Sequence, residues 1–99
     1  MARVNRITRE AAEAVGVQAL AYLADDPERL GRFLALSGLG PETIRAAAHD
    51  ASFLAGVLEY MIGDEALLVA FAERLGAAPE RVVEAQAMLA GPSWERDTA

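Results

Sequence analysis

The sequence contains no cysteine, no lysine and only one histidine, His49. Without cysteine the chain can form no disulfide, no thiolate nucleophile and no cysteine-ligated metal site. A single histidine also leaves few groups for acid–base catalysis at neutral pH. No uncharged run approaches the roughly 18–20 apolar residues that a membrane-spanning helix needs. From these absences we expect a cytoplasmic protein that is not an enzyme, holds no cofactor or metal, and does not act at a membrane.

What the composition does contain predicts one helical domain. The chain has 99 residues, of which 54% are apolar, above the usual share of about 45–50% in soluble proteins. Much of this share is alanine, the residue that most favours a helix. The formal net charge is −6, which repels nucleic acid and anionic membranes over most of the surface.

Signals that start and stop helices recur at short intervals along the chain. Aspartate or threonine stands before several apolar runs, proline opens others, and glycine ends most of them. The spacing predicts helices over about 9–24, 27–37, 41–49, 51–62, 65–75 and 79–90. We therefore predict an all-α fold, a compact bundle of five to six short helices joined by tight Gly, Pro and Asp corners.

The predicted domain boundaries follow from where the helical pattern begins and ends. Residues 1–7, with Arg3 and Arg6, are predicted to be a flexible basic N-terminal arm, 8–91 a single helical domain, and 92–99 a flexible C-terminal tail.

Packing is predicted from the apolar spacing within the helices. The helix over 51–62 has few polar residues and should be the central one. In the second helix the spacing predicts burial of Leu30, Phe33, Leu34 and Ser37. Gly16 and Gly56 lie inside helices, where glycine costs about 1 kcal/mol relative to alanine. We expect each of them to mark a close helix crossing.

The corner between the second and third helices is similar to the helix-hairpin-helix DNA-binding motif, whose centre reads apolar-Gly-apolar-Gly-Pro-x-Thr. The matching residues are Leu36, Gly38, Leu39, Gly40, Pro41, Thr43 and Ile44. In that family, N–H groups of the Gly-apolar-Gly turn hold a DNA phosphate. Here Glu42 stands beside that turn, and Arg45 is the first basic residue after it. The alternative is a structural corner in which Gly38 is a left-handed helix cap, and the negative charge favours that interpretation.

His49, Asp50 and Ser52 have the composition of a hydrolase triad, and this is a third functional hypothesis. Neighbouring helical residues point apart, however, and a helix start explains Asp50 as a cap. Acidic groups near residues 25–28 and 59–65 lack the alternating oxygen ligands and glycine turn of a calcium loop. They stand where acidic residues are expected at helix starts, and we interpret them as caps.

Three stretches, Ala24–Pro41, Phe53–Tyr60 and Asp64–Phe71, together resemble a bacterial family of small proteins known as domain of unknown function 3572. The resemblance extends over roughly Val15–Gly91. It implies a small, cytoplasmic helical protein with no assigned activity, and it supplies no catalytic or binding residue.

The leading functional prediction is therefore a small, non-enzymatic helical module that binds another protein or itself. The alternative is a nucleic-acid-binding domain that uses the Gly38–Gly40 turn. Trp94 is the only tryptophan, and tryptophan is favoured at the centre of protein interfaces. The candidate interaction residues are Gly38, Gly40, Arg45 and Trp94.

Overall fold

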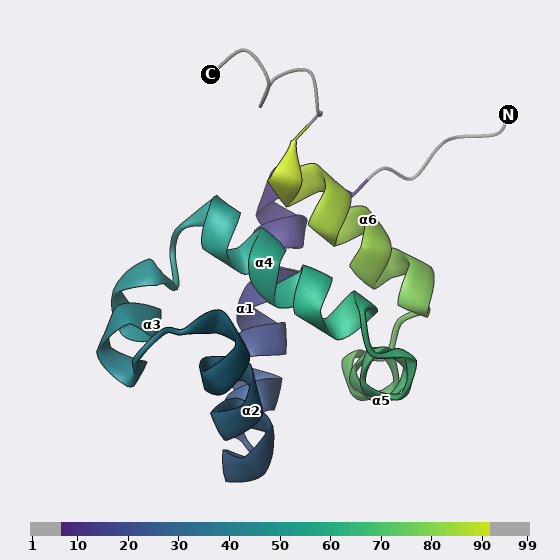
Figure 1. Ribbon diagram of the computed structural model, residues 1–99. Coiled ribbons are helices and arrows are strands. Elements are labelled where there is room, and N and C mark those ends of the chain that lie inside the picture. Colours follow the sequence, from purple (N-terminus) through teal and green to yellow (C-terminus); the bar gives the residue numbers. More distant parts are fainter. Residues whose placement is uncertain (1–6, 92–99) are drawn as a thin grey trace, which may run out of the picture.

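Six α-helices make up the part of the chain that the computed structural model describes, residues 7–91 (Figure 1). They are α1 (Arg9–Ala24), α2 (Pro27–Ser37), α3 (Pro41–Ala47), α4 (Ala51–Ile62), α5 (Glu65–Leu75) and α6 (Pro79–Ala90). Each lies within a residue or two of its predicted range, and the predicted all-α bundle is confirmed. Residues 1–6 of the predicted arm over 1–7, and the whole of the predicted tail over 92–99, lie outside the described residues.

Four side chains cap helix starts as the sequence predicts. Thr8, Asp26, Asp50 and Asp64 each accept a hydrogen bond from a backbone N–H in the next helix, with donor–acceptor distances of 3.0, 2.9, 2.9 and 3.2 Å. A helix start leaves its first N–H groups without intrahelical partners, and each cap satisfies one of them. Local sequence therefore fixes where these helices begin.

Removing one such cap should have a measurable cost. Replacing Asp50 with alanine is expected to lower the free energy of unfolding by about 1 kcal/mol, while asparagine should retain most of the stability. The matched control is Ser52→Ala, which removes an exposed hydroxyl from the same helix turn. It keeps the backbone N–H of residue 52 that donates to the Asp50 carboxylate. Urea unfolding followed by circular dichroism would measure both. Equal losses in the Asp50→Asn and Asp50→Ala variants would show that capping is not what Asp50 contributes.

Two helices end at glycines with left-handed backbones. The φ angle is 74° at Gly38, after α2, and 77° at Gly76, after α5. Residues with a Cβ rarely adopt this conformation, whereas glycine adopts it without strain. The prediction of Gly38 as a left-handed cap is thus confirmed.

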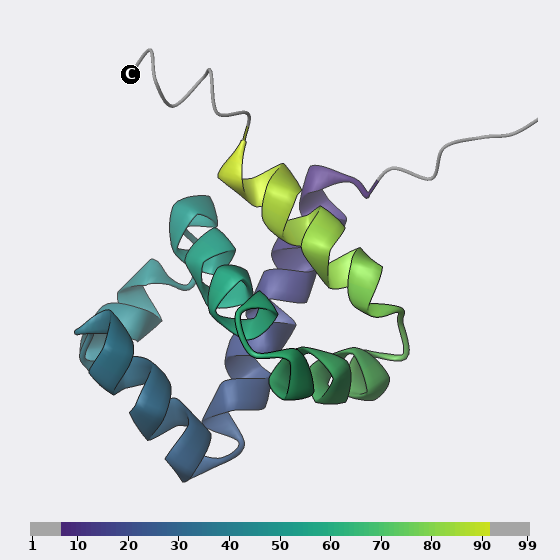
Figure 2. The ribbon, with the colours of Figure 1, turned by 45° about the vertical axis from the view of Figure 1, so that its right-hand side comes forward.

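The core lies where α1, α4 and α6 pack against one another, and α5 covers one end of it (Figures 1 and 2). The largest fully buried side chains are Phe71, Leu23, Leu54, Leu58, Met61, Val57 and Val82. The predicted central position of α4 is confirmed, because α4 contacts α1, α5 and α6. The first and last of the described helices, α1 and α6, are also direct neighbours.

The two helix-interior glycines have different surroundings. A Cβ built on Gly16 would lie 2.9 Å from the Cβ of Leu54, so α1 and α4 approach closely there, as predicted. A Cβ on Gly56 would meet no atom within 4 Å. The prediction of a close crossing at Gly56 is wrong, because this residue lies on an exposed side of α4.

The predicted boundary assigned Ile7 to the flexible arm, but the structure places its side chain in the core. Its side chain is only 5% exposed and is part of the core cluster. It precedes the Thr8 cap, the position from which an apolar side chain can staple a helix start to the fourth helical residue, here the buried Ala12. The ordered domain therefore includes Ile7.

The α2 helix is attached to the bundle through few side chains. Phe33 is its one buried residue within the described chain, and its ring meets those of Phe53 and Tyr60 edge-on. Leu30 and Leu34 are half-buried. Ser37 is exposed, contrary to prediction.

The Ser37 hydroxyl serves the corner after α2 instead of the core. Its oxygen accepts a hydrogen bond from the Leu39 N–H at 3.3 Å. The Ser37 hydroxyl has its hydrogen-bond partners at the exposed corner and therefore does not point into the core. The i, i+3, i+4, i+7 spacing overestimated the buried face of α2 for this reason.

Candidate functional site

The predicted phosphate-binding turn, Gly38–Gly40, lies at the surface between α2 and α3. Gly38 and Gly40 are exposed, and Leu39 is half-buried. The Gly38 N–H donates to the carbonyl of Leu34 at 2.9 Å, and the Leu39 N–H donates to Ser37. Two of the three N–H groups that would hold a phosphate therefore already have partners within the corner.

The other residues predicted for interaction are spread over the chain. Arg45 is exposed in the last turn of α3 and makes no ion pair with any residue of 7–91. Glu42 is exposed in the first turn of the same helix. Trp94, Arg3 and Arg6 lie outside the described residues. DNA binding through this corner stays a prediction.

His49, Asp50 and Ser52 are all exposed. The Asp50 carboxylate accepts the Ser52 N–H at 2.9 Å as the cap of α4. Within residues 7–91, no hydrogen bond joins the imidazole of His49 to either neighbour. The geometry gives the hydrolase hypothesis no assembled triad.

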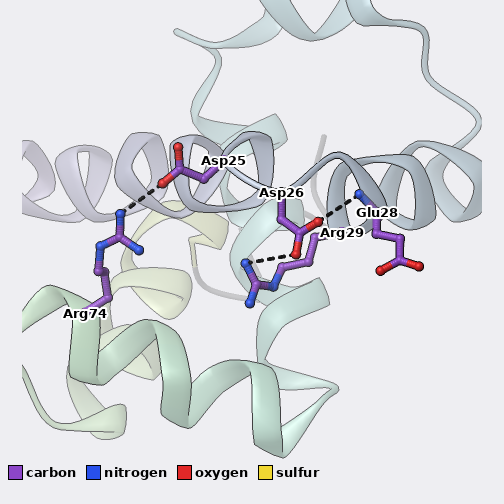
Figure 3. Close-up of polar contacts among 5 residues, drawn as sticks. All are labelled: Asp25, Asp26, Glu28, Arg29 and Arg74. Carbon is purple, nitrogen blue, oxygen red and sulfur yellow. Dashed lines mark hydrogen bonds and ion pairs between the residues drawn. The ribbon is translucent and has the colours of Figure 1, made fainter.

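The acidic residues at the α1–α2 corner have structural contacts (Figure 3). Asp25 accepts from Arg74 at 2.9 Å and so joins the end of α1 to α5. Asp26 caps α2 and also lies 3.7 Å from Arg29. The side chains of Asp25 and Arg74 are 61% and 63% exposed, and ion pairs this exposed contribute less than about 1 kcal/mol. Among the described residues, no three His, Asp or Glu side chains are grouped in a way that could hold a metal ion.

The surface between α2 and α4 contains a hollow of about 270 Å³, which we call the apolar hollow. It is lined by Phe33, Leu36, Ser37, Gly56, Glu59 and Tyr60. The rings of Phe33 and Tyr60 lie 5.1 Å apart at 70°. Leu36 is 72% exposed, more than any other large apolar side chain of residues 7–91. The hollow therefore combines two packed rings with an uncovered leucine and an open stretch of helix at Gly56.

Sequence reasoning did not find the apolar hollow. Leu36 entered only as part of a motif, because spacing alone does not show that the face of α2 next to Phe33 lacks a covering helix. The one sequence signal at this surface was Gly56, a glycine in a helix interior. In the described chain, no atom lies within 4 Å of a Cβ built on it.

Over residues 7–91, these features define an all-α fold of six short helices with a small apolar hollow between α2 and α4. The chain belongs to the family described as Protein of unknown function (DUF3572), whose model matches residues 9–92. The resemblance found in the sequence is thus confirmed. Comparison with curated proteins and with solved structures gave no match. None of the described helices is both long enough and apolar enough to cross a bilayer.

Proposed function

We propose that this chain is a non-enzymatic module that binds a helical segment of another protein in the apolar hollow. The observation that carries the proposal is Leu36, a leucine 72% exposed beside the packed rings of Phe33 and Tyr60. Covering a leucine side chain stabilises a complex by about 1.5–3 kcal/mol. A partner that covers Leu36 would gain this free energy without rearranging the core.

Gly56 gives a second reason to place a partner here. A glycine inside a helix costs about 1 kcal/mol relative to alanine, and no contact within the described chain explains this cost at Gly56. Glycine lets a second helix lie close to the backbone, and an alanine methyl would hold it away. The open helix surface at Gly56 therefore suits a helix from outside the chain.

The charge around the hollow indicates the chemistry of the partner. Glu59 is exposed at its edge, and the whole chain has a net charge of −6. A complementary segment would carry an apolar anchor for the hollow and basic residues on either side of it. Helix-in-groove recognition with regularly spaced anchors is a common mode of peptide binding.

A site-specific crosslinking experiment tests this proposal. A photoreactive benzophenone amino acid is placed at position 36 and, as a control, at position 83, where Val83 is exposed on α6. We expect a protein adduct from position 36 in extracts of the native cells, and little from position 83. The captured partner is then purified, and its affinity is measured by titration calorimetry.

Two substitutions distinguish specific binding in the apolar hollow from nonspecific association. Leu36→Asp should weaken binding at least tenfold, because it places a charge where the partner's apolar anchor lies, while Val83→Asp should change it less than twofold. An adduct between two copies of this chain would show self-association in place of a different partner. Equal adducts from both positions, or equal effects of the two aspartate substitutions, would contradict the proposal.

A further inference from the structure

Tyr60 also lines a second hollow, where residues of α1, α2, α4 and α5 meet. It has a volume of about 230 Å³. Its polar lining consists of Tyr22, Arg29, Arg32, Tyr60 and Asp64, and we call these five residues and the space between them the arginine cleft. In Figure 2, α2 and α5 lie on either side of the second half of α1. The cleft plays no part in the function proposed above.

Tyr22 is the most buried side chain among the five polar residues of the cleft. Its side chain is 8% exposed, and its ring packs against Phe71 with centroids 5.5 Å apart. The guanidinium carbon of Arg29 lies over the same ring, 4.5 Å from its centre. The hydroxyl makes no hydrogen bond to any residue of 7–91. Within this range no side-chain oxygen is both sealed and unpartnered, so the Tyr22 hydroxyl keeps access to solvent.

Of the two guanidinium groups in the cleft, that of Arg32 has no charged partner within the described chain. Arg32 makes no ion pair with any described residue, and Arg29 has only Asp26, at 3.7 Å. The one carboxylate in the lining, Asp64, accepts the N–H of Leu67 at 3.2 Å as the cap of α5. Hydrogen-bond donors therefore exceed free acceptors in the cleft, even though the chain as a whole is acidic.

We propose that the arginine cleft binds a small organic molecule through a carboxylate or phosphate group. Arg32 would supply the charge and a planar pair of donors that matches two oxygens of such a group. The hydroxyls of Tyr22 and Tyr60 would donate to the same group or its neighbour. Leu67 and Ala70 form an apolar wall for the carbon part of the molecule.

Nuclear magnetic resonance titrations of the full chain test this site. The probes are glycerol phosphate, succinate and inorganic phosphate, each added at constant ionic strength, with sodium chloride as the reference. We expect saturable shifts for the Nε–H of Arg32 and for the amides of Ala66 and Leu67 with at least one organic anion. Saturation by glycerol phosphate but not succinate would identify a phosphate ester, and the reverse a carboxylate. Shifts that never saturate, or that chloride reproduces, would overturn the proposal.

Three variants locate the binding. Arg32→Gln should weaken the saturating anion at least tenfold, because a charged hydrogen-bond partner is lost. Tyr22→Phe keeps the ring and should weaken binding severalfold. Arg9→Gln removes the same charge from an arginine whose side chain is 61% exposed outside the cleft, and it should change affinity less than twofold. If Arg32→Gln and Arg9→Gln behave alike, the cleft is not the site. Crosslinking from position 36 tests the other hollow independently.

Discussion

Replacing Gly16 with valine is expected to lower the free energy of unfolding by about 3 kcal/mol. The first side-chain carbon alone would lie 2.9 Å from the Cβ of Leu54, closer than two such atoms approach in folded proteins. The atom in the way is fixed to the backbone of α4, so the two helices must move apart. Overpacking of this kind costs about 1–3 kcal/mol, and valine adds two further methyl groups. Thermal unfolding should show a fall in Tm of more than about 10 °C.

Gly56→Ala is the matched control, because it changes a glycine in the middle of a neighbouring core helix. Nothing lies within 4 Å of the new methyl group, and the helix gains about 1 kcal/mol in propensity. We expect Tm to rise by about 4–8 °C. If Gly16→Val were as stable as the native chain, α1 and α4 would not approach each other as closely as the structure shows. The same Gly56→Ala variant should bind the partner more weakly, since its methyl group occupies the apolar hollow.

Replacing Phe33 with alanine is expected to release α2 while the rest of the bundle stays folded. Phe33 is the one buried side chain on this helix within the described chain, and it supplies the ring contacts to Phe53 and Tyr60. Truncating a buried phenylalanine costs about 3–5 kcal/mol. This cost falls on a helix with little else to hold it, whereas α1, α4 and α6 keep their own packing. Opening of this kind is local and not global.

Amide hydrogen exchange measures this difference helix by helix. In the Phe33→Ala variant the amides of α2 and α3 should lose protection by a factor of about 100 or more, which corresponds to the loss of at least about 3 kcal/mol. Those of α1, α4 and α6 should change much less. Leu36→Ala, on the same helix but 72% exposed, should leave all six helices within about 0.5 kcal/mol of the native chain. Uniform loss of protection across the bundle would show that α2 is part of the cooperative core.

The sequence predicts the helices well because local chemistry determines their ends. Asp50 caps the start of α4 by accepting a hydrogen bond from the N–H of Ser52, only two residues further along the chain. Gly38 ends α2 because its φ angle is positive. Neither depends on contacts distant in the sequence. The close helix crossing predicted at Gly16 is also confirmed, but the same pattern failed at Gly56.

The candidate sites were harder to predict because they arise between helices. Gly16 lies on a side of its helix that α4 covers, whereas no described helix covers the side of α4 on which Gly56 lies. The periodicity of the sequence does not contain this information. Tyr22 and Arg32 come together in the arginine cleft because the α1–α2 corner folds α2 back beside α1. Spacing along one helix shows which residues share a face, but not which helix, if any, faces them.

The contact between α1 and α6 has a consequence for how the protein is made. The ribosome releases α1 first and α6 last, at about 5–20 residues per second in living cells. Each of these helices covers apolar surface on the other. Until α6 has left the exit tunnel, the side chains of Val82, Ala85 and Leu89 cannot fill the core. The native bundle therefore closes only after α6 has left the exit tunnel, and until then the apolar face of α1 that α6 covers stays exposed.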